Sequence, residues 1–155
     1  MTEPSEPNQR SEVLDLYKLA VEMADRVSAR RGTANAFFLS VQTTLVTLVG
    51  FGIPKLSNSP WWVPSAVALS GITLSAAWWM QLRSYRDLNA AKFKVINKLE
   101  ERLPVKIFAD EWEFLKSDPI PHWRKRYAEL GASERSVPLV FAVAHLILCG
   151  GTLAV

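Results

Sequence analysis

The chain has 155 residues, of which 49% are hydrophobic and 21% charged, and its formal net charge at pH 7 is +3. One cysteine, Cys149, excludes an intrachain disulfide framework and a cysteine-rich metal site. The small positive charge argues weakly for anionic lipid and hardly at all for nucleic acid. Because apolar and charged residues are segregated in blocks, the composition indicates a membrane protein of one domain.

Residues 1–10 contain two prolines and predict a disordered tail. Residues 11–31 carry apolar side chains at three- and four-residue spacing, with Ser11 as N-cap, and predict an amphipathic helix outside the membrane. Residues 1–31 lack an apolar stretch of signal length, so we expect no cleavable signal peptide. The next proline is Pro54, which allows this helix to run straight into the membrane.

Three uncharged segments predict membrane spans. Residues 32–53 and 61–82 are each long enough to cross a bilayer core of roughly 30 Å, and the proline-bounded turn 54–60 joins them as a helical hairpin. Residues 136–155 form the third span, with Pro138 near the start of its helix.

The first span is less apolar than an inert anchor. Thr43 and Thr47 belong to a stripe of hydroxyl side chains, whereas Asn35 and Gln42 share another face. Such side chains in lipid usually find hydrogen-bond partners on other helices, which favours a role in helix packing. The alternative is a stripe that faces water or lines a pore.

His145 and Cys149 stand four residues apart on the third span. Two ligands are too few for a metal unless symmetric copies supply others, so we expect no metal and no cofactor. The favoured interpretation is that His145 and Cys149 are uncharged residues packed at a contact between helices. The alternative is a proton-sensing or pore role, because an ionisable residue inside a membrane is a functional candidate.

Tryptophan pairs bracket the second span. Trp61 and Trp62 precede Trp78 and Trp79 by 17 residues, or about 25 Å along a helix. Indoles at this separation are typical of two aromatic belts at the level of the lipid headgroups.

Residues 83–135 predict a charged helical stalk and a small helical cap. With neither proline nor glycine between Ile72 and Leu103, the second span is expected to continue as the stalk. An apolar stripe on it needs cover, which either the N-terminal helix or a neighbouring subunit would supply. The residues that define the stripe are Tyr85, Leu88, Val95 and Leu99.

The cap is predicted to contain two helices. Asp110 as N-cap and Glu113 three residues later would open a short helix through Leu115, and His122–Leu130 would follow with Gly131 as its C-cap. Arg124, Lys125 and Arg126 lie shortly before the third span, where lipid headgroups are a better partner than nucleic acid.

Lysine and arginine set the expected topology. Residues 1–31 hold 5 of them, the turn 54–60 holds 1 and residues 83–135 hold 12. The positive-inside rule therefore places the N-terminus and the 83–135 block in the cytoplasm, with the C-terminus outside.

No catalytic motif is found, and we expect no enzyme. The acidic cluster between Glu100 and Glu113 is interpreted as a solvated or salt-bridged face. An acid–base site there is the least favoured alternative, because it would need a pocket that the sequence does not indicate.

Two stretches resemble the RipA-type octameric membrane proteins of bacteria. They are the junction Ala29–Ser40 and the stalk Arg83–Ile96, followed by Leu99-Glu100, Leu103-Pro104 and Asp110-Glu111-Trp112. The resemblance covers residues 11–155. It implies a homo-oligomer, such as an octamer, in the bacterial cytoplasmic membrane, linked to envelope homeostasis and host adaptation, without an agreed biochemical activity.

The expected fold is therefore an all-α membrane protein with three transmembrane helices, a cytosolic stalk and a small cap, assembled from copies of itself. Membrane lipids and an unidentified cytosolic partner at 83–135 are the other expected partners. The alternative function is an oligomeric pore or a membrane-disrupting effector, such as those of phage defence.

Overall fold

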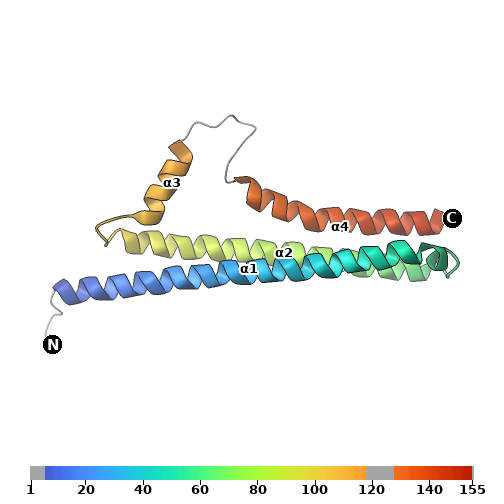
Figure 1. Ribbon diagram of the computed structural model, residues 1–155, viewed down its shortest axis with the longest axis horizontal. Helices are drawn as coiled ribbons and strands as arrows, with labels where there is room; N and C mark the ends of the chain where they lie inside the picture. The colour runs from blue at the N-terminus through green and yellow to red at the C-terminus, as the bar shows by residue number, and fades with distance from the viewer. Residues whose placement is uncertain (1–5, 118–127, 155) are drawn as a thin grey trace. The chain divides into compact units, whose positions relative to one another are not determined.

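A computed structural model describes residues 6–117 and 128–154 of the chain. The regular structure of these residues is entirely helical (Figure 1). Its helices are α1 (Glu6–Ser57), α2 (Trp62–Glu100), α3 (Ile107–Ser117) and α4 (Ala128–Ala154). The all-α fold is confirmed, as are three helices long and apolar enough to cross a membrane.

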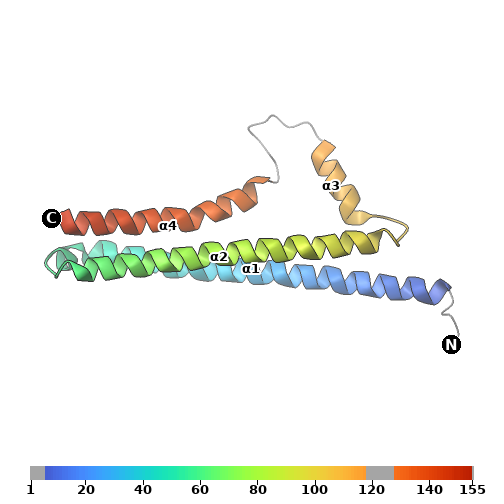
Figure 2. The same cartoon turned by 180° about the vertical axis from the view of Figure 1, so that it is seen from behind.

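The described residues fall into two compact units. Those of Met1–Arg30 and Tyr85–Tyr127 form the first, here called the stalk unit. Those of Arg31–Ser84 and Ala128–Val155 form the second, here called the membrane unit. Helices α1 and α2 each contribute to both, and Figure 2 shows them from behind.

Helix α1 is longer than the sequence predicts at both ends. It begins at Glu6, inside the predicted tail and before the predicted N-cap Ser11. It continues through Pro54 to Ser57, because polar side chains satisfy carbonyl groups in its last turn. The Ser57 hydroxyl donates to the carbonyl of Ile53 at 2.7 Å, and the Asn58 amide donates to that of Pro54 at 2.8 Å.

The uninterrupted course of α2 from the second span into the stalk matches the prediction. In the stalk unit its buried Ile96 packs with Tyr17 and Ala24 of α1. Phe93 and Leu99 are partly buried against this core. The N-terminal helix therefore covers the stalk, as the first of the two predicted alternatives proposed.

Only part of the predicted stalk stripe takes part in this contact. Leu99 packs against the core and Tyr85 is half-buried. Leu88 and Val95, by contrast, remain 47% and 56% exposed. The reason is the rotation of α2, which directs Ile96 rather than its neighbour Val95 toward α1.

Helix α3 starts three residues before the predicted cap Asp110. Its first turn is capped instead by Glu100, whose carboxylate accepts hydrogen bonds from the backbone N–H of Phe108 at 2.9 Å and of Ala109 at 3.2 Å. The Tyr17 hydroxyl donates to the same carboxylate at 3.0 Å. Glu100 is fully buried, so it does not belong to a solvated acidic face. A negative charge at a helix N-terminus is also favoured by the helix dipole.

Helix α4 also departs from the prediction. It passes through Gly131, expected to be a C-cap, and holds Pro138 inside the helix rather than near its start. No described glycine has the positive φ that a C-cap of this kind needs. The predicted helix His122–Leu130 lies mostly outside the described residues.

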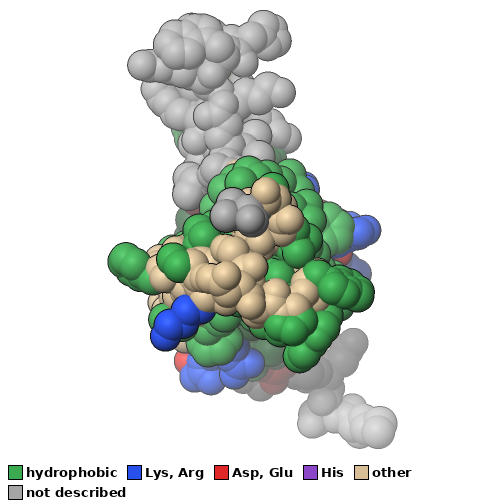
Figure 3. All heavy atoms as spheres, turned by 90° about the vertical axis from the view of Figure 1, so that its right-hand side faces the viewer, with side chains coloured by type: hydrophobic (Ala, Val, Ile, Leu, Met, Phe, Trp, Pro, Cys, Tyr) green, Lys and Arg blue, Asp and Glu red, His purple; other side chains and the backbone are tan. Residues whose placement is uncertain are grey.

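Seen end-on, hydrophobic side chains lie around the rim of the membrane unit (Figure 3). Leu48, Leu69 and Leu146 are examples from α1, α2 and α4, and each is more than half exposed. Outward apolar side chains on all three helices are what lipid-facing spans require.

Candidate functional site

Buried polar side chains lie where α1, α2 and α4 meet inside the membrane unit. Gln42 of α1, Ser75 of α2 and His145 of α4 are at most 2% exposed. All three belong to the apolar stretches that qualify as membrane spans. They form one cluster, which we call the polar cluster.

The partners in the polar cluster show which atom donates and which accepts in each hydrogen bond. The Gln42 amide nitrogen Nε2 donates to the Gly71 carbonyl at 3.0 Å and to the Ser75 hydroxyl at 2.7 Å. The Ser75 hydroxyl in turn donates to the Gly71 carbonyl at 3.0 Å. Gln42 Oε1, which can only accept, lies 2.8 Å from His145 Nε2. This network therefore assigns the proton to His145 Nε2.

Gly71 is the position at which the His145 ring approaches α2. A Cβ atom added to Gly71 would collide with three atoms of that ring. Small residues are typical of close helix contacts in membranes, where they allow side chains to reach the facing backbone. Because Gly71 has no side chain, the His145 ring of α4 can pass against α2 and reach Gln42 of α1.

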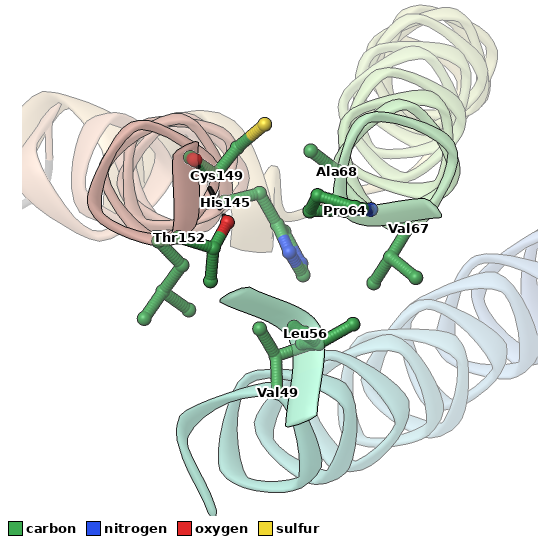
Figure 4. A pocket seen from close by; sticks show the side chains of 9 residues that line it. Val49, Leu56, Pro64, Val67, Ala68, His145, Cys149 and Thr152 are labelled. Atoms are coloured by element: carbon green, nitrogen blue, oxygen red, sulfur yellow. Dashed lines mark hydrogen bonds between the residues drawn. The ribbon is translucent and has the colours of Figure 1, made fainter. Parts of the chain in front are cut away.

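His145 also borders a void of about 10 Å³, about the size that one water molecule requires. Cys149 and Thr152 line it from α4, and apolar side chains of α1 and α2 complete its walls (Figure 4). The Thr152 hydroxyl donates to the carbonyl of Cys149 at 2.8 Å. Among the described residues no group of three His, Cys, Asp or Glu side chains could hold a metal ion.

Asn35 has a separate partner. Its side-chain carbonyl accepts a hydrogen bond from the Trp78 indole at 2.9 Å. Trp78 stacks on Phe38, with ring centroids 5.8 Å apart, and is only 1% exposed. The Trp78 side chain therefore packs inside the membrane unit and does not point outward as a headgroup contact requires, whereas its level in the membrane stays a prediction.

The other three belt tryptophans are exposed. Trp61 and Trp62 lie at the start of the second span, and Trp79 lies near its end. The guanidinium of Arg83 lies 5.9 Å from the centroid of the Trp79 ring, in the geometry of a cation–π contact.

Thr43 and Thr47 are exposed on α1, so within one copy the hydroxyl stripe does not pack as closely as Gln42. Ser40 and Thr44 also belong to this stripe, and their hydroxyls bond within α1. Ser40 donates to the Ala36 carbonyl and Thr44 donates to the Ser40 carbonyl, both at 2.8 Å. The predicted headgroup residues Arg124, Lys125 and Arg126 lie outside the described residues.

The structure adds an ion pair that the sequence analysis missed. Arg31 of α1 and Glu134 of α4 pair with each other, and each side chain is slightly more than one quarter exposed. Both residues stand just outside a predicted span, and this position is the signal that could have suggested the pair. The pair joins the first and third spans at one end.

The polar contacts of the membrane unit hold its three spans together, because most of these hydrogen bonds run between helices.

The sequence model of the Octameric membrane protein family (8xMP) matches residues 14–154, a range that extends from α1 to the end of α4. The chain belongs to this family. The predicted resemblance is thereby confirmed, and so is the multi-pass membrane character of the chain.

The family description specifies a membrane protein and an octamer, and it names no reaction and no ligand. Self-association is therefore the property that membership implies for this chain. No curated protein and no solved structure matches the chain.

Proposed function

We propose that this chain is the subunit of a non-catalytic homo-octamer with a structural or regulatory role in the bacterial inner membrane. The role would lie in envelope homeostasis or in adaptation to stress or a host. The description of the family as octameric supports the number of copies. The two long helices shared by both units suit a scaffold that connects a membrane assembly with the cytoplasm.

One observation carries the proposal. Large apolar side chains of the stalk unit remain exposed in a single copy, including Leu16 at 55% and Val95 at 56%. Charged residues surround them on α1 and α2, which supports a position of this unit outside the lipid. Lipid therefore cannot cover these side chains, and an exposed apolar surface in water favours association with protein.

The proposed orientation follows the positive charge. The stalk unit and the N-terminus would lie in the cytoplasm, and the turn near Asn58 would lie outside together with the C-terminus. Trp61, Trp62 and Trp79 would contact lipid headgroups. A cytosolic partner at 83–135 remains part of the proposal.

Native mass spectrometry of the full chain extracted in mild detergent tests the assembly. The expected species contains eight copies of the 17.4 kDa chain. A monomer at concentrations well above those in the membrane would overturn the proposal. Labelling of a cysteine at position 58 in intact cells, in a Cys149→Ser chain, tests the orientation, and protection from an impermeant reagent would contradict it.

The exposed Thr43 and Thr47 favour a second function, an oligomeric pore or membrane-disrupting effector, for example in phage defence. Gln42 no longer supports it, because its side chain is fully buried and bonded within one copy. Ion flux in proteoliposomes that falls in Thr43→Val/Thr47→Val would favour the pore. The control is Thr73→Val, which changes an exposed threonine of α2.

A further inference from the structure

The two flanks of the α1–α2 pair in the stalk unit differ in how they are covered. Helix α3 packs on one flank, where the rings of Phe93 and Phe108 meet with centroids 5.4 Å apart. Val95 is two residues beyond Phe93 on α2, so its side chain points about 160° away from that of Phe93. α3 thus contacts one flank through its first turn, on the side of α2 away from Val95, while residues 110–114 of α3 are exposed.

The other flank carries apolar side chains from both helices. On α1, Leu16, Leu19 and Met23 recur at three- and four-residue spacing and are each about half exposed. On α2, Leu88 and Val95 are seven residues apart on one face. We call these five residues the open flank.

The helix geometry places both sets on the same side. Leu16 precedes the buried Tyr17 by one residue, and Val95 precedes the buried Ile96 by one residue. Each is therefore rotated from the contact between the helices by the same angle in the same sense. Because the two helices are antiparallel, equal rotations direct the two side chains to the same flank.

Helix α3 has an uncovered face of its own. Ile107 and Phe114 are 57% and 75% exposed and stand seven residues apart. Asp110 and Glu111 lie between them, three and four residues after Ile107, so the four side chains share one face. This outer face of α3 combines two apolar side chains with two carboxylates.

The charges of the two surfaces are complementary. Lys98 is exposed and follows Val95 at three residues, which places it beside the open flank, and Arg102 is exposed in the turn that follows α2. The outer face of α3 is acidic through Asp110 and Glu111. None of these four groups forms an ion pair with another described residue.

We propose that the outer face of α3 in one copy docks on the open flank of the next copy. Ile107 and Phe114 would cover the apolar side chains there, and Asp110 and Glu111 would meet Lys98 and Arg102. The contact is heterologous, because it joins two different surfaces, and contacts of this kind form a closed ring when the rotation between neighbouring copies is one eighth of a turn. The inference rests on the proposed octamer and identifies the surface that joins its subunits.

Disulfide cross-linking between two differently tagged chains tests the contact in membranes. Both chains carry Cys149→Ser; one adds Phe114→Cys and the other adds Met23→Cys. The expected product is a disulfide-linked dimer that contains both tags. In the control, Lys18→Cys replaces Met23→Cys, since Lys18 is exposed on the other side of α1, and the yield of dimer should fall several-fold. Equal yields, or no dimer from an intact octamer, would overturn the contact.

Charge reversal tests the same contact in the purified assembly. Asp110→Lys/Glu111→Lys should shift the octamer toward smaller species, and Lys98→Glu/Arg102→Glu in the same chain should restore it. Arg86→Glu in place of the second pair should not, because Arg86 is exposed nine residues before Val95, on the opposite side of α2. An Asp110→Lys/Glu111→Lys chain that stays fully octameric refutes the docking alone. A wild-type chain that is monomeric refutes the proposed function and the docking together.

Discussion

The stalk unit and the membrane unit both bury polar side chains between helices, but they bury different kinds. The stalk unit buries a carboxylate, that of Glu100, and surrounds it with the Tyr17 hydroxyl and two backbone N–H groups. The membrane unit buries an amide, an imidazole and two hydroxyls. Removing a charge from water is expensive, and the cost is greater inside lipid, where only neutral groups are readily accommodated.

The two units also differ in what covers their exposed apolar side chains. Leu69 of the membrane unit is 65% exposed and Val95 of the stalk unit is 56% exposed. Lipid covers the first without any further protein. In the proposed orientation the second faces water in a single copy, so only protein can cover it, and the stalk unit is therefore the proposed place of the subunit contact.

Gly71→Val should have the largest effect, because it attacks the closest helix contact of the membrane unit. The new side chain would collide with the His145 ring, and the strain should lower the free energy of unfolding by more than about 3 kcal/mol. Thermal unfolding and size-exclusion profiles in detergent measure the loss.

A second substitution identifies the collision as the cause. His145→Ala removes the ring, so the double variant Gly71→Val/His145→Ala should be more stable than Gly71→Val alone. If the double variant is no better, the damage arises elsewhere on α2 and the packing of His145 on Gly71 is not the critical contact.

Glu100→Ala is the corresponding change in the stalk unit. It leaves the Tyr17 hydroxyl and the N–H groups of Phe108 and Ala109 without their acceptor, which should cost about 3 kcal/mol. Hydrogen exchange should become faster in α3 while the spans stay protected. The matched control is Glu101→Ala, an exposed neighbour, and equal exchange in both variants would show that Glu100 does not anchor α3.

The same contact predicts a loss of stability at alkaline pH. Burial, and then the hydrogen bond and the charge of Glu100, raise the pKa of Tyr17 from 10.0 to about 12. The raised pKa means that the contribution is fully present below pH 10 and is lost as pH rises toward 12. The loss amounts to about 2–3 kcal/mol. Urea unfolding of wild type and Tyr17→Phe over this range measures it, and parallel pH profiles would contradict the assignment.

The sequence predicts the spans and the long helices well because both depend on local composition and on the absence of helix breakers. Gln42 and His145 could be identified as candidates for the same reason, since polar side chains stand out in an apolar segment. Their pairing could not be foreseen. It depends on how α4 packs against α1, and on Gly71, whose small size matters only once the third helix is in place.

The errors occur where local signals do not decide the outcome, and two of them arise from tertiary contacts. Asp110 has the pattern of an N-cap, yet Glu100 supplies the acceptor from a different helix. Pro138 has the chemistry of a helix start, yet α4 extends before it. Periodicity found an apolar stripe on the stalk but could not choose between the faces centred on Val95 and on Ile96, which differ by one residue.

The adjacent tryptophans Trp78 and Trp79 allow a smaller effect to be measured within one helix. Trp78→Phe removes the buried indole that donates to Asn35 and stacks on Phe38. One unmade hydrogen bond and the lost ring area should lower stability by about 1 kcal/mol. Trp79→Phe removes an exposed indole and should change the unfolding midpoint little in detergent, because a headgroup contact contributes only where headgroups are present. In liposomes the effect of Trp79→Phe should grow while that of Trp78→Phe stays the same. Equal effects of the two substitutions in detergent would mean that Trp78 is not held inside the membrane unit, and the distinction between a buried and a lipid-facing indole would be lost.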